Sequence, residues 1–162
     1  MVNRKVAIVM GSQSDSETVK EATEILKQFN VPYAAKVLSA HRTPKEVEAF
    51  VTDAQRSGVK VFIAAAGGSA ALAGVIASHT TLPVIGIPME TSNLNGMDSL
   101  LSTVQMPAGI PVASMAIGKA GAKNAGLFAV AILSVSDAAL AEKLAEYRSA
   151  MREKILKTKL DL

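Results

Sequence analysis

The sequence predicts a three-layer α/β domain in which helices cover both faces of a parallel sheet. Short apolar runs alternate with segments of helical periodicity, in the order strand, helix, strand, helix. The runs are apolar throughout instead of alternating with polar residues, which is typical of strands buried on both faces. With 162 residues, 49% hydrophobic and 19% charged, the chain has enough apolar material for one sizeable core. We therefore expect a single domain over residues 1–162, with a sheet of about five strands and a long C-terminal helix.

Each expected strand except the one at 82–88 is followed directly by an expected helix. In chain order the elements are a strand at 5–10, a helix at 14–29, a strand at 33–38, a helix at 44–57, a strand at 59–65, a helix at 70–79, a strand at 82–88, a strand near 110–117 and a helix near 123–135. Ser14 and Thr43 each stand three positions before a glutamate, which is the spacing of a capping box. Pro44 suits a first helical position, and Gly58 suits a helix end.

The last segment, 137–160, is expected to form the long C-terminal helix. Its apolar residues fall on one stripe at helical spacing: Leu140, Leu144, Tyr147, Met151 and Ile155. Such a stripe must be covered, either by the chain's own sheet or by a neighbouring subunit, and we expect a neighbouring subunit and hence a homo-oligomer. The segments 64–73 and 120–131 are rich in Ala and Gly and permit close packing within or between chains.

Composition limits where the protein can act and which kinds of partner it can bind. The chain has no cysteine, so it has neither disulfides nor thiolate metal ligands, and with no leader pattern at the N-terminus we expect a cytoplasmic protein. The net charge is +3, but the basic residues are scattered outside the tail and aromatic residues are few, so no nucleic-acid partner is expected. Residues 61–89 carry no Asp, Glu, Lys or Arg, yet Gly and Pro divide them into strand-sized and helix-sized pieces, so no membrane span is expected.

Ligands of parallel α/β sheets bind beyond the carboxyl ends of the strands, and three loops there carry candidate residues. The first loop supplies Gly11, Ser12, Ser14 and Asp15. Its glycine allows close backbone approach, hydroxyls and N–H groups at a helix start suit a phosphate, and Asp15 offers acceptors to ribose hydroxyls. Simple capping by Ser14 or Asp15 explains the same residues equally well.

The second loop places Ser39, His41 and Arg42 between a strand and a helix. Histidine is the side chain that titrates near neutral pH, and arginine is a fixed cation able to clamp a phosphate. A solvated surface pair is the alternative interpretation.

The third loop contains Gly67, Gly68, Ser69 and Ala70, where the glycines leave room for a flat ligand. Tight packing of strand against helix is the alternative here. His79, at the end of an expected helix, is interpreted as a capping or surface residue.

Several enzyme classes lack their motifs in this sequence. It has no P-loop, no G-x-G-x-x-G fingerprint, no G-x-S-x-G elbow and no cluster of His and carboxylates, so no metal ion is expected. Among the classes considered, acid/base chemistry on a phosphorylated small molecule is the one that the remaining candidate residues fit.

Six separated motifs in register resemble the phosphoribosylaminoimidazole carboxylase family over nearly the whole chain. They are Gly11-Ser-Gln-Ser-Asp15, Ser39-Ala-His-Arg-Thr-Pro44, Gly67-Gly68, Asn95-Gly-Met-Asp-Ser-Leu100, Val104-Gln-Met-Pro107 and Ala116-Ile-Gly-Lys-Ala-Gly-Ala-Lys-Asn124. The resemblance implies a flavodoxin-like three-layer fold, an octamer with active sites at subunit contacts, and no metal or organic cofactor.

The resemblance also implies an activity in purine biosynthesis. The bacterial members are mutases that convert 5-(carboxyamino)imidazole ribonucleotide to 4-carboxy-5-aminoimidazole ribonucleotide by decarboxylation and recarboxylation. His41 matches the catalytic histidine, and Ser12, Asp15 and Arg42 match nucleotide-binding positions. We assign Arg42 and Ser39 to the phosphate, Asp15 to the ribose, and the backbone of 67–70 to the base.

One departure concerns the third loop. The mutases usually read Gly-Gly-Ala-Ala-His-Leu-Pro-Gly, whereas this chain has Ala71 in place of that histidine, as in the related carboxylases that use free carbon dioxide. Arg42 and Gly68 favour the mutases, because those carboxylases usually carry Lys at the position of Arg42 and Arg at the position of Gly68. We favour the mutase, with the carboxylase as the close alternative and a non-catalytic nucleotide-binding module as a third.

Overall fold

The strands form one parallel sheet in the order β2-β1-β3-β4-β5. The computed structural model describes residues 4–160. The strands are β1 (Val6–Met10), β2 (Tyr33–Val37), β3 (Val61–Ala66), β4 (Val84–Pro88) and β5 (Ala113–Ser114). This order is that of flavodoxin-like folds, so the predicted fold class is confirmed.

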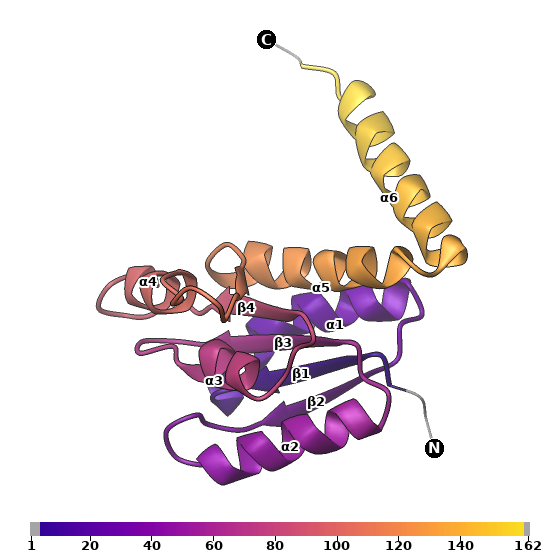
Figure 1. Ribbon diagram of the computed structural model, residues 1–162. Helices are drawn as coiled ribbons and strands as arrows, with labels where there is room; N and C mark the ends of the chain where they lie inside the picture. The colour runs from indigo at the N-terminus through magenta and orange to yellow at the C-terminus, as the bar shows by residue number, and fades with distance from the viewer. Residues whose placement is uncertain (1–3, 161–162) are drawn as a thin grey trace.

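Helices cover both faces of this sheet and make three layers. The helical elements of the described residues are the 3₁₀ turn η1 (Gln13–Asp15) and the α-helices α1 (Ser16–Gln28), α2 (Pro44–Arg56), α3 (Leu72–Ser78), α4 (Met97–Val104), α5 (Gly118–Ser134) and α6 (Ala138–Leu156). Figure 1 shows α1 and α5 on one side of the sheet and α2 and α3 on the other. The core is accordingly split into two apolar clusters, one on each face.

Burial on both faces explains the uninterrupted apolar runs. In β1, Val6 and Ile8 face the α1 and α5 side, whereas Ala7 and Val9 face the α2 and α3 side. Strands β1 and β4 are buried throughout, and β3 is buried except at its last residue, as predicted. The prediction is wrong for β2, where Val37 is 43% exposed, because β2 lies at the edge of the sheet.

The capping boxes expected at Ser14 and Thr43 are wrong. A short 3₁₀ turn precedes α1, which moves the box two residues earlier, to Ser12 and Asp15. The Thr43 hydroxyl makes no cap; it accepts a hydrogen bond from the Ser39 N–H at 2.9 Å and donates one to the Ser39 carbonyl at 3.0 Å. Both rearrangements tighten loops at the carboxyl ends of strands, where the candidate residues lie.

Other helix ends agree more closely with expectation. Pro44 begins α2, and Gly58 follows its end with φ 93°, in the left-handed region that favours glycine. Helix α5 begins at Gly118, five residues earlier than expected, and the strand expected near 110–117 is reduced to the two residues of β5. Helix α4 was not expected at all, and two of its apolar side chains, Leu101 and Val104, are about half exposed instead of marking a buried face.

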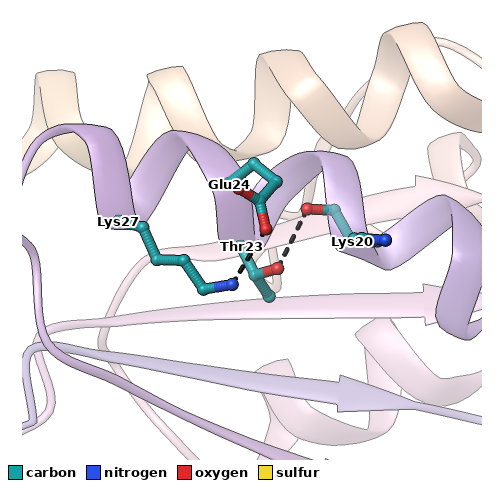
Figure 2. Close-up of polar contacts among 4 residues, drawn as sticks. All are labelled: Lys20, Thr23, Glu24 and Lys27. Carbon is teal, nitrogen blue, oxygen red and sulfur yellow. Dashed lines mark hydrogen bonds and ion pairs between the residues drawn. The ribbon is translucent and has the colours of Figure 1, made fainter.

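Helix α1 is amphipathic, with polar contacts outside and close packing inside. Figure 2 shows the outer contacts: Lys27 Nζ lies 2.8 Å from Glu24 Oε1, and the Thr23 hydroxyl donates to the Lys20 carbonyl at 2.9 Å. The hydrogen bond from Lys27 lowers the pKa of Glu24, but so exposed a pair contributes little stability. The buried residues of the helix, Val19, Ala22, Ile25 and Leu26, lie in the core.

Helix α6 points away from the sheet (Figure 1). The first part of its predicted stripe packs on the chain's own core, because Leu140, Leu144 and Tyr147 are partly buried and the Tyr147 ring lies 5.7 Å from that of Phe29. The second part is open, with Met151 54% and Ile155 73% exposed. Contact with a neighbouring subunit therefore stays a prediction, now confined to the outer part of the helix.

None of the helices in the part of the chain that the structure describes is long and apolar enough to span a membrane.

Candidate active site

A cavity of about 540 Å³ opens where β1, β2 and β3 end. The chain leaves β1 toward β2 on one side and leaves β3 toward β4 on the other, so the crevice lies at the switch point where flavodoxin-like sheets bind ligands. Its lining consists of Gly11, Ser12, Ser14, Asp15, Ser39, Ala40, His41, Arg42, Ala66, Gly67, Ser69, Ala71 and Leu72. The three loops singled out in the sequence thus meet at one place.

The first loop folds around the Asp15 carboxylate. Its Oδ2 accepts from the Ser12 N–H at 3.2 Å and its Oδ1 lies 3.4 Å from the Ser14 hydroxyl, while the Ser12 hydroxyl accepts from the Ser14 N–H at 3.3 Å. Partial burial raises the pKa of Asp15, and the hydrogen bonds from Ser12 and Ser14 oppose that effect. Ser12 and Asp15 thus form the cap, and both line the cavity together with Ser14. Binding of a phosphate or a ribose by this loop stays a prediction.

Arg42 connects the second loop to the first. Its backbone N–H and its Nε both donate to the Ser39 hydroxyl, at 3.2 and 3.5 Å, and its Nη2 lies 3.5 Å from the Gly11 carbonyl. His41 stands beside it on the same exposed turn and lines the cavity. Hydrogen bonds therefore hold the Arg42 guanidinium between the two loops, and the His41 imidazole lines the same cavity as the serines of the first loop.

The third loop alternates between the cavity and α4. Gly67 and Ser69 line the cavity, whereas Gly68 and Ala70, within the described residues, lie outside its lining. The N–H of Gly68 donates to the Ser99 hydroxyl at 2.9 Å, and that of Ala70 donates to Ser102. Binding by the backbone of 67–70 stays a prediction.

Ser99 and Ser102 are contacts that the sequence analysis missed. Ser99 falls inside the motif Asn95–Leu100, which was noted, but its partner lies 31 positions away and no local pattern indicates that distance.

His79 ends α3, and it is absent from the cavity lining within residues 4–160. In the same residues no group of three or more His, Asp or Glu side chains is arranged to hold a metal ion.

This combination suits one kind of ligand. Serine hydroxyls and a guanidinium match the oxygens of a phosphate, a carboxylate matches ribose hydroxyls, and an imidazole supplies acid/base chemistry. Fold and topology define a flavodoxin-like α/β protein. An acid/base site for a phosphorylated small molecule in this cavity stays a prediction.

Comparison with known proteins identifies the family. A model of the AIR carboxylase family matches residues 5–154, and the chain therefore belongs to this family. A relative from Saccharolobus solfataricus is 52% identical over 157 residues, covering 97% of this chain and 98% of that protein. One from Bacillus subtilis is 56% identical over 153 residues, covering 94% of each. Both are named N5-carboxyaminoimidazole ribonucleotide mutase.

Solved structures agree with the fold. The crystal structure of Treponema denticola PurE matches with a TM-score of 0.87 and 30% sequence identity, and the match covers 95% of each chain. The resemblance stated from the six motifs is thus confirmed by family and by fold. Each residue's role in the cavity stays a prediction.

Proposed function

We propose that this chain is a mutase of purine biosynthesis that converts N5-carboxyaminoimidazole ribonucleotide to 4-carboxy-5-aminoimidazole ribonucleotide. The observation that carries the proposal is the mutase name of relatives that are 52% and 56% identical over nearly the whole chain. The carboxylase alternative, suggested by Ala71, is not favoured by these relatives. Ala71 lines the cavity, so the departure changes one point of its wall and leaves His41 in place.

Three groups of contacts would hold the substrate. Arg42 and Ser39 bind the phosphate, and Ser12 and Ser14 contribute hydroxyls from the opposite loop. Asp15 accepts hydrogen bonds from the ribose, and the loop 67–70 lies along the base. The convergence of the first two loops through Arg42 Nη2 and the Gly11 carbonyl supports this arrangement, because it places the cation within reach of both loops.

His41 then moves one proton between two positions of the substrate. As the bond between the exocyclic nitrogen and the carboxyl carbon breaks, carbon dioxide leaves, and the imidazolium gives its proton to that nitrogen. The ring carbon next attacks the carbon dioxide, forms the new carbon–carbon bond and returns its own proton to the imidazole. Proton and carboxyl group are both conserved, so the enzyme ends as it began.

His41→Asn tests this role, with His79→Asn as its matched control. We expect kcat to fall by about 100-fold or more for His41→Asn, because general acid/base catalysis contributes on that order. His79 caps α3 away from the cavity lining, so its variant should retain the activity of the original protein. Steady-state turnover of the carboxyamino nucleotide measures both. A His41→Asn variant within tenfold of the unchanged protein would remove the histidine from the mechanism.

Two further expectations belong to the same proposal. The protein assembles as a homo-oligomer, supported by the exposed apolar side chains on the outer part of α6, and the family resemblance implies that the oligomer is an octamer. It acts in the cytoplasm, supported by a chain without cysteine. A non-catalytic nucleotide-binding module is the weaker alternative, because binding a phosphate does not need the imidazole of His41.

A further inference from the structure

The loop between β3 and α3 is made of tight turns that need support from outside. The Ala70 N–H lies 2.9 Å from the Gly68 carbonyl, and the Ala71 N–H lies 2.8 Å from the Ser69 carbonyl, so successive bonds each close over only three residues. Gly68 has φ 68°, in the left-handed region. Such a chain has little regular backbone pairing of its own to hold its shape.

Two serines of α4, Ser99 and Ser102, lie three positions apart on one face of the helix and supply the support. The Ser99 hydroxyl, whose residue is fully buried, accepts from the Gly68 N–H at 2.9 Å. The Ser102 hydroxyl accepts from the Ala70 N–H at 3.0 Å. Three carbonyls lie within reach of its own hydrogen: that of Asp98 at 2.7 Å, that of Gly68 at 3.1 Å and that of Ser99 at 3.3 Å. The two hydroxyls therefore fix the outer side of the loop while the inner side faces the cavity.

We propose that Ser99 and Ser102 are positioning residues for the mutase reaction. They hold Gly67 and Ser69 where these residues form the wall against which the imidazole ring lies, and so set the place of the ring relative to His41. The inference rests on the proposed function, since it assigns the ring to this wall. It gives α4 a task in the reaction although neither serine lines the cavity among the described residues.

The expected effect is on turnover more than on binding. Without its serine partner, the Ala70 N–H, in a residue only 2% exposed, loses its outward hydrogen bond and the loop relaxes toward other partners. The phosphate and ribose contacts come from the first two loops and keep their geometry. Ground-state affinity therefore changes little, whereas a displaced ring loses its alignment with His41.

The test uses Ser99→Ala, Ser102→Ala and the double variant. Thr103→Val is the matched control, because Thr103, like Ser99, is a buried residue of α4. Among the described residues its hydroxyl donates to the Ser99 carbonyl within the helix and makes no hydrogen bond to the loop. Ser102→Thr is the rescue variant, because it keeps a hydroxyl at the same position. We expect kcat to fall about tenfold in each alanine variant with KM within about threefold, the size of effect one lost hydrogen bond produces. Thr103→Val and Ser102→Thr should stay within about twofold.

Amide hydrogen exchange of the full chain gives a readout independent of turnover. Exchange of the Gly68 amide should accelerate in Ser99→Ala, and that of Ala70 in Ser102→Ala, with both unchanged in Thr103→Val. The positioning role would be overturned if the alanine variants kept the kcat of the unchanged protein, or if Thr103→Val lost as much kcat as they do. In either case normal turnover by the unchanged protein would still uphold the proposed function. A wild-type protein without mutase turnover would overturn the proposed function and the positioning role together.

Discussion

Asp15 serves the fold and the cavity with the same carboxylate. It closes the capping box with Ser12 at the start of η1, and it lines the cavity at the place assigned to the ribose. Partial burial raises its pKa, because removing a carboxylate from water disfavours the charged form more than the loop hydrogen bonds restore it. The folded protein therefore carries this negative charge at some cost.

This cost predicts the direction in which the free energy of unfolding changes with pH. Because the pKa of Asp15 is higher in the folded than in the unfolded chain, the folded state holds the proton to higher pH. Stability from this group is greatest below its ordinary pKa of about 4 and falls as pH rises through the raised value. Asp15→Asn does not titrate, so the free energy of unfolding of the unchanged protein relative to this variant should decrease as pH rises across that window. Denaturant unfolding at fixed protein concentration measures it; a difference that increases with pH would contradict the burial argument.

Among single residues, those that line the cavity were easier to predict from the sequence than the serines of α4 that hold the third loop in place. The three loops were predicted because each follows an apolar run, and the ends of parallel strands meet at one edge. Ser99 and Ser102 could not be predicted in the same way, since their partners lie 31 and 32 positions earlier and only the folded sheet brings α4 to them. The capping box expected at Ser14 was wrong for a related reason, because a 3₁₀ turn that spacing does not reveal moved the cap to Ser12. The one expected at Thr43 was wrong because its hydroxyl bonds to the backbone of Ser39 instead.

At the scale of elements, α1 and α5 form one layer through a close approach at Gly126. A Cβ at this position would lie 2.8 Å from the Ala22 carbonyl oxygen and 3.0 Å from Ile25 Cβ. The Gly- and Ala-rich segment 120–131 therefore serves close packing within the chain at this point, a matter that composition left open between contacts within and between chains. Edge strand β2 gives the opposite lesson, because its position in the sheet, which composition does not encode, leaves it exposed.

Gly126→Ala should therefore destabilise the protein. A mid-helix Gly to Ala change normally stabilises, but here the added methyl group must push α5 away from α1, and we expect a loss of about 1–3 kcal/mol in the free energy of unfolding. Lys123→Ala, an exposed change on the same helix, should leave that free energy within about 0.5 kcal/mol. Denaturant titration followed by circular dichroism compares the two. Increased stability of Gly126→Ala would show that the helices can separate at no cost.

At the scale of the whole molecule, α6 is the element that the rest of the domain does not enclose. Its inner part is attached to the core through Tyr147, and its outer part presents Met151 and Ile155 to solvent in the single chain. Large exposed apolar side chains in a row indicate an interaction surface, and a second copy of the chain is the partner that the proposed homo-oligomer supplies.

The double variant Met151→Ser with Ile155→Ser should lower the assembly size. Both residues lie on the outer part of α6, so the change removes apolar contact area without touching the packing of Tyr147 against Phe29. Arg152→Ser is the control, since it changes an exposed charged residue of the same helix. Light scattering coupled to size-exclusion chromatography gives the mass of each. A full-length protein that is already monomeric would contradict the assembly, and an unchanged mass in the double variant would remove α6 from the contact.

Turnover of the purified protein with each substrate supplied separately distinguishes the mutase reaction from carboxylation by free carbon dioxide. One assay supplies N5-carboxyaminoimidazole ribonucleotide alone, and the other supplies aminoimidazole ribonucleotide with dissolved carbon dioxide or bicarbonate. We expect efficient formation of 4-carboxy-5-aminoimidazole ribonucleotide from the first substrate at low carbon dioxide, which would make Ala71 a tolerated variation. Efficient use of the second substrate only, or of neither, would contradict it.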